Sequence, residues 1–357
     1  MRTEGKIRKI IKIRIFLLRF KKISNKDNSQ RNNMKTSNRS LLRFLFIALL
    51  FSLILGKQSV ASENAKKFKI ITTVAPITNM VQNIAGSYAD VIGLVPDGVD
   101  SHTFEPIPSD IKTIQAADLI IANGLDLELP TLILAEKVKK KETAIVQLGN
   151  RTLNKEDWQY DFSFPREHGH PNPHLWMNIQ LVMRYAEIIR DSLNELDPRN
   201  QEQYFLNTKN YLEKLAKLDQ AIFDCVKTIP EKNRKLVTYH DSFAYFAPRY
   251  GMSVIAAIQP SDFSEPSPQE VISVIKQIKQ ISVPAIFGSE EFPSKVMQQI
   301  AREANVQFID QLSDDELPKP PNHSFIGMMA NNMSVMTKAL GGKETCTGNI
   351  DASNNQF

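Results

Sequence analysis

Short runs of β-branched and apolar residues alternate along the chain with longer stretches in which apolar residues recur every three or four positions. Four such runs predict buried strands at residues 68–74, 89–94, 118–122 and 144–148. The stretches between them predict helices near residues 77–85, 108–115 and 129–140. Strands that alternate with helices form parallel sheets, so this part of the chain predicts one α/β lobe.

The same alternation returns in the second half of the chain. Strands are predicted at residues 235–239, 252–257, 284–287 and 306–309. Helices are predicted near residues 242–249, 268–278, 293–304 and 325–340. The second set predicts a second α/β lobe with its own central parallel sheet.

A long helical pattern without glycine separates the two sets. Asp197 suits an N-cap and Pro198 a first turn, and the pattern continues to about Lys227, where Ile229 and Pro230 end it. One face carries an apolar stripe, formed by Tyr204, Tyr211, Leu215, Leu218 and Ile222. About 30 residues at 1.5 Å each make a rod of roughly 45 Å. We predict that one long rigid helix joins the two lobes.

These elements divide the chain into five parts. Residues 62–196 are expected to form the N-terminal lobe, residues 197–230 the linker helix and residues 231–341 the C-terminal lobe. Residues 342–357 are a tail, and residues 1–61 are an N-terminal extension that includes a signal peptide.

Basic residues are concentrated at the N-terminus. Residues 1–61 hold 15 Lys and Arg but only two acids, a charge of +13, which leaves −8 for residues 62–357 out of a total of +5. An acidic body argues against a nucleic-acid partner and suits a cation.

The N-terminal segment has the pattern of an export signal. Arg39 and Arg43 precede an apolar run at residues 44–55, which is shorter than the ~20 residues of a membrane-spanning helix. Small residues follow this run, so we expect cleavage after Ala61. We also expect translation from Met34 and a periplasmic protein without a lipid anchor. An uncleaved membrane anchor is the alternative. Residues 1–33 are basic and apolar, and the alternatives there are a misassigned start codon and a membrane-surface helix.

The chain has two cysteines, Cys225 and Cys346. An oxidising compartment permits one disulfide between them, but their separation leaves the pairing open. Two thiols exclude a metal cluster made of cysteines.

Histidines and an aspartate follow the ends of predicted strands. His102 follows the second strand and His240 follows the first strand of the second lobe, while His174 lies just before a helix and Asp310 ends the last strand. In open α/β sheets, ligands bind beyond the carboxyl ends of the strands. The pattern therefore predicts a metal site in the cleft between the lobes, with a set of side chains suited to Zn²⁺ and acceptable to Mn²⁺.

Several segments give a family resemblance over about residues 68–341. SHTFEP around His102, NPHLWM around His174 and VTYHDSF around His240 resemble the zinc- and manganese-specific solute-binding proteins of ABC transporters. The resemblance implies two α/β lobes on one long helix, and His102, His174 and His240 as the first three metal ligands. It implies an aspartate after the last strand as the fourth ligand, either Asp310 or Asp314. We expect Asp310, because it ends the strand directly, and we expect Asp314 to be solvated or to cap a helix.

His168 and His170 precede the second predicted ligand in the segment REHGHPNPH. Zinc receptors of this family often carry a longer loop rich in histidine and acids at this point. The resemblance therefore raises an auxiliary metal site there, against the alternative of solvated loop histidines.

Enzyme motifs such as HExxH, GxSxG and phosphate-binding glycine loops are absent from the sequence. Four protein ligands would fill a tetrahedron, whereas a catalytic zinc keeps a position open for water. We therefore expect a monomeric periplasmic receptor, not an enzyme, that captures a divalent metal and delivers it to an ABC transporter permease. Zn²⁺ is the expected ion, with Mn²⁺ second. An exported metallohydrolase and an adhesin are the alternatives.

Overall fold

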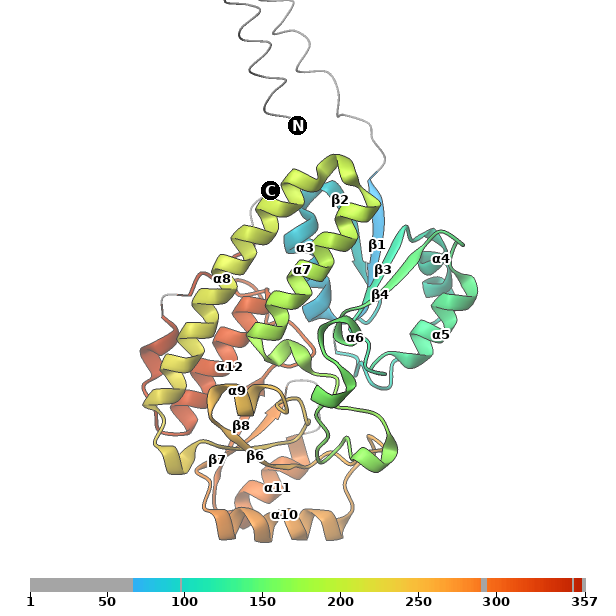
Figure 1. Ribbon diagram of the computed structural model, residues 1–357. Helices are drawn as coiled ribbons and strands as arrows, with labels where there is room; N and C mark the ends of the chain where they lie inside the picture. The colour runs from blue at the N-terminus through green and yellow to red at the C-terminus, as the bar shows by residue number, and fades with distance from the viewer. Residues whose placement is uncertain (1–66, 97, 290–293, 349, 355–357) are drawn as a thin grey trace, which may run out of the picture. The chain divides into compact units, whose positions relative to one another are not determined.

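Two parallel sheets organise the chain. The computed structural model describes residues 67–96, 98–289, 294–348 and 350–354, so the expected signal segment and its cleavage site lie outside the described residues. Within these residues the first sheet has the strand order β2-β1-β3-β4 and the second has the order β6-β5-β7-β8, with every pairing parallel (Figure 1). The strands are β1 (Phe68–Thr72), β2 (Ala89–Gly93), β3 (Leu119–Ala122), β4 (Ala144–Gln147), β5 (Lys235–Thr238), β6 (Ser253–Ala257), β7 (Ala285–Ser289) and β8 (Gln307–Leu312). The predicted fold class is confirmed.

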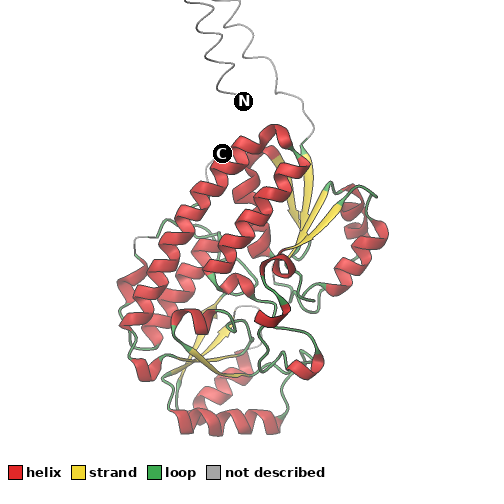
Figure 2. Ribbon diagram, viewed as in Figure 1, coloured by secondary structure: helices red, strands yellow, loops and turns green. Residues whose placement is uncertain are grey.

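Helices cover both faces of each sheet (Figure 2). They are α3 (Ala75–Ala85), α4 (Pro108–Ala116), α5 (Leu129–Val138), α6 (Leu148–Thr152), α7 (Ile179–Leu196), α8 (Gln201–Thr228), α9 (Phe246–Tyr250), α10 (Pro268–Ile281), α11 (Ser294–Ala304) and α12 (Phe325–Ala339). Helix α9 is shorter than the predicted helix at residues 242–249. Strand β8 continues three residues beyond its predicted end, which matters for the site.

The largest apolar core belongs to both lobes. It contains Ile77 of α3, Ile189 of α7, Leu215 of α8 and Met333 of α12, all fully buried, together with Phe287 of the second sheet. Two smaller cores lie on the outer faces, one between the first sheet and α4 and α5, the other between the second sheet and α10 and α11. The two sheets are therefore held by one helical layer that they share.

Helix α8 is the predicted rod. It has 28 residues and runs from one lobe to the other (Figure 1). Its buried face consists of Tyr204, Thr208, Tyr211, Leu215, Leu218, Ile222, Cys225 and Val226. The helix begins at Gln201, three residues after the predicted first turn at Pro198, because Pro198–Asn200 form a separate 3-10 turn. The Asp197 carboxylate accepts a hydrogen bond of 2.6 Å from Asn200 Nδ2 in that turn.

A disulfide between Cys225 and Cys346 ties the C-terminal tail to α8, which settles the pairing that the sequence left open. The tail then continues to the first lobe, where Asn354 Oδ1 accepts hydrogen bonds of 3.0 Å from Asn79 and Asn83 of α3. The described helices include none with the length and apolar character needed to span a bilayer.

We expect the Cys225→Ala/Cys346→Ala double variant to be less stable than the oxidised protein. The disulfide closes a loop with a sequence separation of 121 residues, and such links stabilise proteins by about 2–4 kcal/mol. Urea unfolding of the variant, and of wild type with and without reductant, measures the difference. Equal stability of oxidised wild type and the variant would contradict this expectation.

Candidate metal centre

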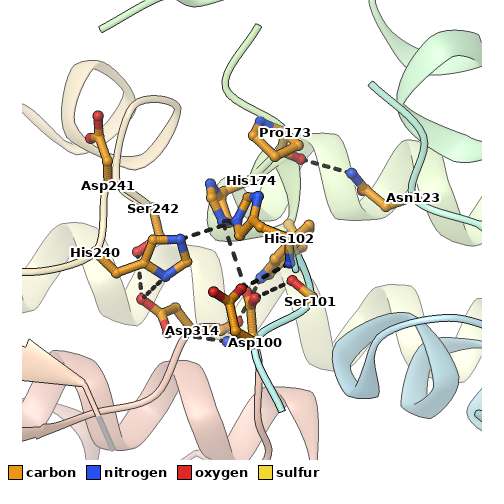
Figure 3. Close-up of polar contacts among 12 residues, drawn as sticks. Asp100, Ser101, His102, Asn123, Pro173, His174, His240, Asp241, Ser242 and Asp314 are labelled. Atoms are coloured by element: carbon orange, nitrogen blue, oxygen red, sulfur yellow. Dashed lines mark hydrogen bonds and ion pairs between the residues drawn. The ribbon is translucent and has the colours of Figure 1, made fainter. Parts of the chain in front are cut away.

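Three histidines from separate parts of the chain meet between the lobes. His102 lies in the loop between β2 and α4, His174 lies just before α7, and His240 follows β5. The Nε2 atom of His102 is 3.2 Å from Nε2 of His174 and 3.2 Å from Nε2 of His240. Figure 3 shows the three rings turned toward one another. The structure thus brings three of the four predicted residues together, within the distances at which they could share one ion.

Asp310 does not join them. It lies inside β8 and is exposed, and it belongs to none of the metal-ligating clusters found among the described residues. The prediction that Asp310 ends the strand is wrong. The pairing of β7 with β8 shifts register after Gly288, and β8 continues to Leu312 before the chain turns toward the cleft.

Asp314 and Asp315, in the turn after β8, take that place. They are only 2% and 4% exposed, so the expectation that Asp314 is solvated is also wrong. Asp314 Oδ2 lies 3.1 Å from Nδ1 of His240 and accepts a hydrogen bond of 2.9 Å from Ser242 (Figure 3). An aspartate on the Nδ1 side leaves Nε2 of His240 directed at the cluster.

Asp315 belongs to two groups that could hold a metal ion, one with Asp100 and His102 and the other with His240 and Asp314. One of its oxygens accepts a hydrogen bond from the hydroxyl of Ser101. The other, Oδ1, lies 3.8 Å from Nε2 of His174 and has no hydrogen-bond partner among the described residues. Buried carboxylate oxygens are normally hydrogen-bonded or bound to a metal, so this oxygen is available to a cation.

The acidic turn is fixed from two sides. Trp176, which follows His174 in the sequence, donates its indole N–H to the carbonyl of Asp314 at 2.8 Å. The side chain of Asn332, on α12, accepts a hydrogen bond of 2.9 Å from the backbone N–H of Ser313 and donates one to its carbonyl. The carboxylates are therefore placed by both the first lobe and α12.

Asn172 orients His174, and the sequence analysis missed it. Its Oδ1 lies 2.8 Å from Nδ1 of His174 and also accepts the backbone N–H of that residue at 3.0 Å. An amide oxygen can only accept, so Nδ1 carries the proton and Nε2 is free to bind an ion. The Asn172 amide donates to the carbonyl of Asp241 at 2.7 Å, which links the two lobes beside the histidines.

A second buried network holds the backbone before His174. Asn123 donates from Nδ2 to the carbonyl of Pro173 at 2.9 Å (Figure 3), and its Oδ1 accepts from the hydroxyl of Tyr185. The Glu128 carboxylate accepts the backbone N–H groups of Asn123 and Gly124 at 2.8 and 3.0 Å. Gly124 has a φ of 82°, and a Cβ there would lie 2.2 Å from the side chain of Asn150, so this turn requires glycine.

Two more carboxyl groups meet behind the histidines, one from each lobe. Asp161 and Asp241 hydrogen-bond to each other. Burial, and then the charge of Asp241, raise the pKa of Asp161 to about 9, and burial also raises the pKa of Asp241. The pair therefore shares a proton at neutral pH and holds the lobes together without two adjacent charges.

The three histidines differ in charge. Burial, and then the charge of His240, lower the pKa values of His102 and His174, so both rings are neutral at pH 7. Burial alone also lowers the pKa of His240, but the nearby carboxylates, Asp314 first among them, raise it to about 9. The site thus pairs two neutral imidazoles with a cationic one and buried acids.

His168 and His170 lie outside the cluster, at a neighbouring cavity of about 210 Å³ that also reaches His102. Both are exposed, and Nδ1 of His170 is 2.9 Å from the carboxylate of Asp126. The two side chains therefore line the approach to the site.

Two α/β lobes on one long helix, with side chains from both lobes that could hold a metal ion between them, are the architecture of a solute receptor for a metal. A family model described as "Zinc-uptake complex component A periplasmic" matches residues 70–339. The chain belongs to this family of metal-binding ABC transporter substrate-binding proteins.

Individual relatives carry the names of different metals. The iron-binding protein YfeA of Yersinia pestis is 33% identical over 306 residues, which cover 83% of this chain and 94% of that protein. The manganese ABC transporter substrate-binding lipoprotein PsaA of Streptococcus mitis is 28% identical over 316 residues, 86% of this chain and 99% of the relative. The structure of the periplasmic zinc-binding protein TroA of Treponema pallidum matches with a TM-score of 0.71 at 27% identity, covering 77% and 99%.

We expect Asn172→Ala to weaken metal binding by about ten- to a hundredfold, the usual cost of losing a residue that orients a ligand. Without the Asn172 oxygen, the His174 ring is no longer fixed with Nε2 toward the cluster. Titration calorimetry measures the affinity, and Asn210→Ala, on the exposed face of α8, is the matched control. Equal affinities of the two variants would show that Asn172 does not orient the ring.

Proposed function

We propose that this protein captures a divalent transition metal, Zn²⁺ in preference to Mn²⁺, and delivers it to an ABC transporter permease. The observation that carries the proposal is the cluster of three imidazoles close enough to share one ion, beside a buried carboxylate with one oxygen that has no hydrogen-bond partner among the described residues. Such a set suits a cation and little else.

Asp315 is proposed as the fourth ligand, in place of Asp310. His102 and His174 would bind the ion from the first lobe, and His240 and Asp315 from the second. Asn172 and Asp314 would keep the rings of His174 and His240 turned to it. An ion held in this way joins the two lobes, so its release requires them to separate or their loops to move.

The donor atoms support zinc as the cargo. Three nitrogens and one oxygen match the tetrahedral sites that Zn²⁺ prefers, whereas Mn²⁺ favours more oxygen ligands and water. The names of the relatives include zinc, manganese and iron, and this breadth keeps Mn²⁺ as the second candidate.

The remaining features fit a receptor that does not act as an enzyme. Four protein ligands leave no position for a reacting water, and the family consists of solute-binding proteins. The cleavable signal expected before Ser62 would place the protein in the periplasm. We propose that it is a monomer there and binds to its permease.

We expect His102→Ala, His174→Ala and His240→Ala each to weaken Zn²⁺ binding by about tenfold or more, because each removes an imidazole from a closed set of ligands. His168→Ala and His170→Ala, which alter exposed side chains of the neighbouring loop, should bind almost as wild type. Calorimetric titration of purified protein with Zn²⁺ and with Mn²⁺ checks both the ranking and the preferred ion. The reverse ranking, or turnover of a substrate without stoichiometric binding, would overturn the proposal.

The acidic residues provide a separate prediction. Asp315→Asn should weaken Zn²⁺ binding by about tenfold or more and speed release to a chelator, because the charged ligand is lost. Asp314→Asn should change binding less, since the amide oxygen can still accept from His240. Asp310→Asn, on the exposed face of β8, is the control. Strong loss in Asp314→Asn with little change in Asp315→Asn would mean that the two acids have exchanged roles.

A further inference from the structure

A phenylalanine from the second lobe covers the most exposed histidine of the cluster. Phe263 lies in the loop between β6 and α10, and its ring stacks on His102 with centroids 4.6 Å apart and planes 19° from parallel. Phe164, from the first lobe, lies 5.6 Å from His102 and 6.0 Å from Phe263. The two phenylalanines thus form an apolar cap made by both lobes.

The backbone at Phe263 has a strained conformation. Its φ of 58° is in the left-handed region, which bulky residues rarely adopt. The Phe263 N–H donates to the carbonyl of Pro260 at 3.0 Å, and the Asp262 carboxylate accepts the backbone N–H of Ser264 at 3.1 Å. Strain of this kind persists where the surrounding structure fixes it, and it is common in residues that clamp ligands.

The cap stands on the solvent side of the site. His174 and His240 are fully buried, while His102 is partly exposed. The cavity of about 210 Å³ beside the cluster is lined by His102, Phe164 and Phe263. Water that reached an ion at the cluster from this cavity would pass the edge of the Phe263 ring.

We propose that Phe263 is a specificity-determining residue, which keeps water out of the ion's coordination shell and so favours ions that accept four ligands. This inference rests on the proposed function. An apolar shell around a metal site controls the access of solvent, and Zn²⁺ is stable with four protein ligands. Mn²⁺ instead gains from added water ligands. The ring therefore disfavours Mn²⁺ without contributing a ligand atom.

Co²⁺ bound to the purified protein tests this, because four-coordinate Co²⁺ absorbs visible light far more strongly than five- or six-coordinate Co²⁺. We expect the strong bands of four-coordination in wild type and weaker bands in Phe263→Ala, as water joins the shell. The ratio of Zn²⁺ to Mn²⁺ affinity should fall by about tenfold in this variant. Phe263→Tyr, which keeps the ring, should behave as wild type.

Phe162→Ala is the matched control, since Phe162 lies in the same loop as Phe164 but is 48% exposed. If Phe263→Ala does not fold, Phe263→Gly removes the ring while suiting the left-handed backbone. Unchanged Co²⁺ bands and an unchanged affinity ratio in the folded variant would overturn the role of Phe263 and leave the receptor function standing. Failure of wild type to bind any of these ions would instead refute the function itself.

Discussion

The packing of α3, α7, α8 and α12 into one apolar core is the constraint on which the rest of the structure depends. Each sheet packs one face against these helices, so the two lobes share this core. Close packing of this kind resists deformation. It fixes the direction in which the carboxyl ends of β2 and β5 point, and thereby brings His102 and His240, which follow those strands, within 3.2 Å of each other.

Around the histidines the structure gathers more negative charge than it neutralises by ordinary ion pairs. Asp314 and Asp315 are buried beside His240, and Asp161 and Asp241 share a proton behind it. Burying carboxylates is costly unless a cation or a proton compensates them. The carboxylates around His240 raise its pKa against the effect of burial, so this region favours positive charge. A divalent cation is the natural counterpart of such a site, and the lobes that supply its ligands would then be bound through it.

The alternating strand and helix patterns were sufficient to predict the two-lobe fold and the long helix. They also placed His102 and His240 after strands whose ends lie at one edge of a parallel sheet, whereas His174 lies before a helix and was identified by the family resemblance. The pattern was not sufficient to identify the aspartate that lies beside the histidines. The pattern predicts that Asp310 ends a strand, but the pairing of β7 with β8 shifts register beside Gly288 and β8 continues to Leu312. A shift of that kind depends on contacts between strands and leaves no local signal. The contact of Phe263 with His102 was equally hidden, since the two residues lie far apart in the sequence. Asn172 lies only two residues before His174, but the spacing alone does not show that its side chain turns back to the ring. Spacing likewise could not show that Cys225 and Cys346 meet.

Helix α12, the last long helix of the chain, packs against both α3 and α8. The first lobe therefore cannot complete its core until nearly the whole chain has been synthesised, and contacts over such distances in sequence form slowly. The side chains at positions 102, 174, 240 and 315 come together only at that late stage. A nascent chain that has not yet produced α12 thus lacks the assembled cluster, so the affinity of the proposed site for an ion arises only with the last step of folding.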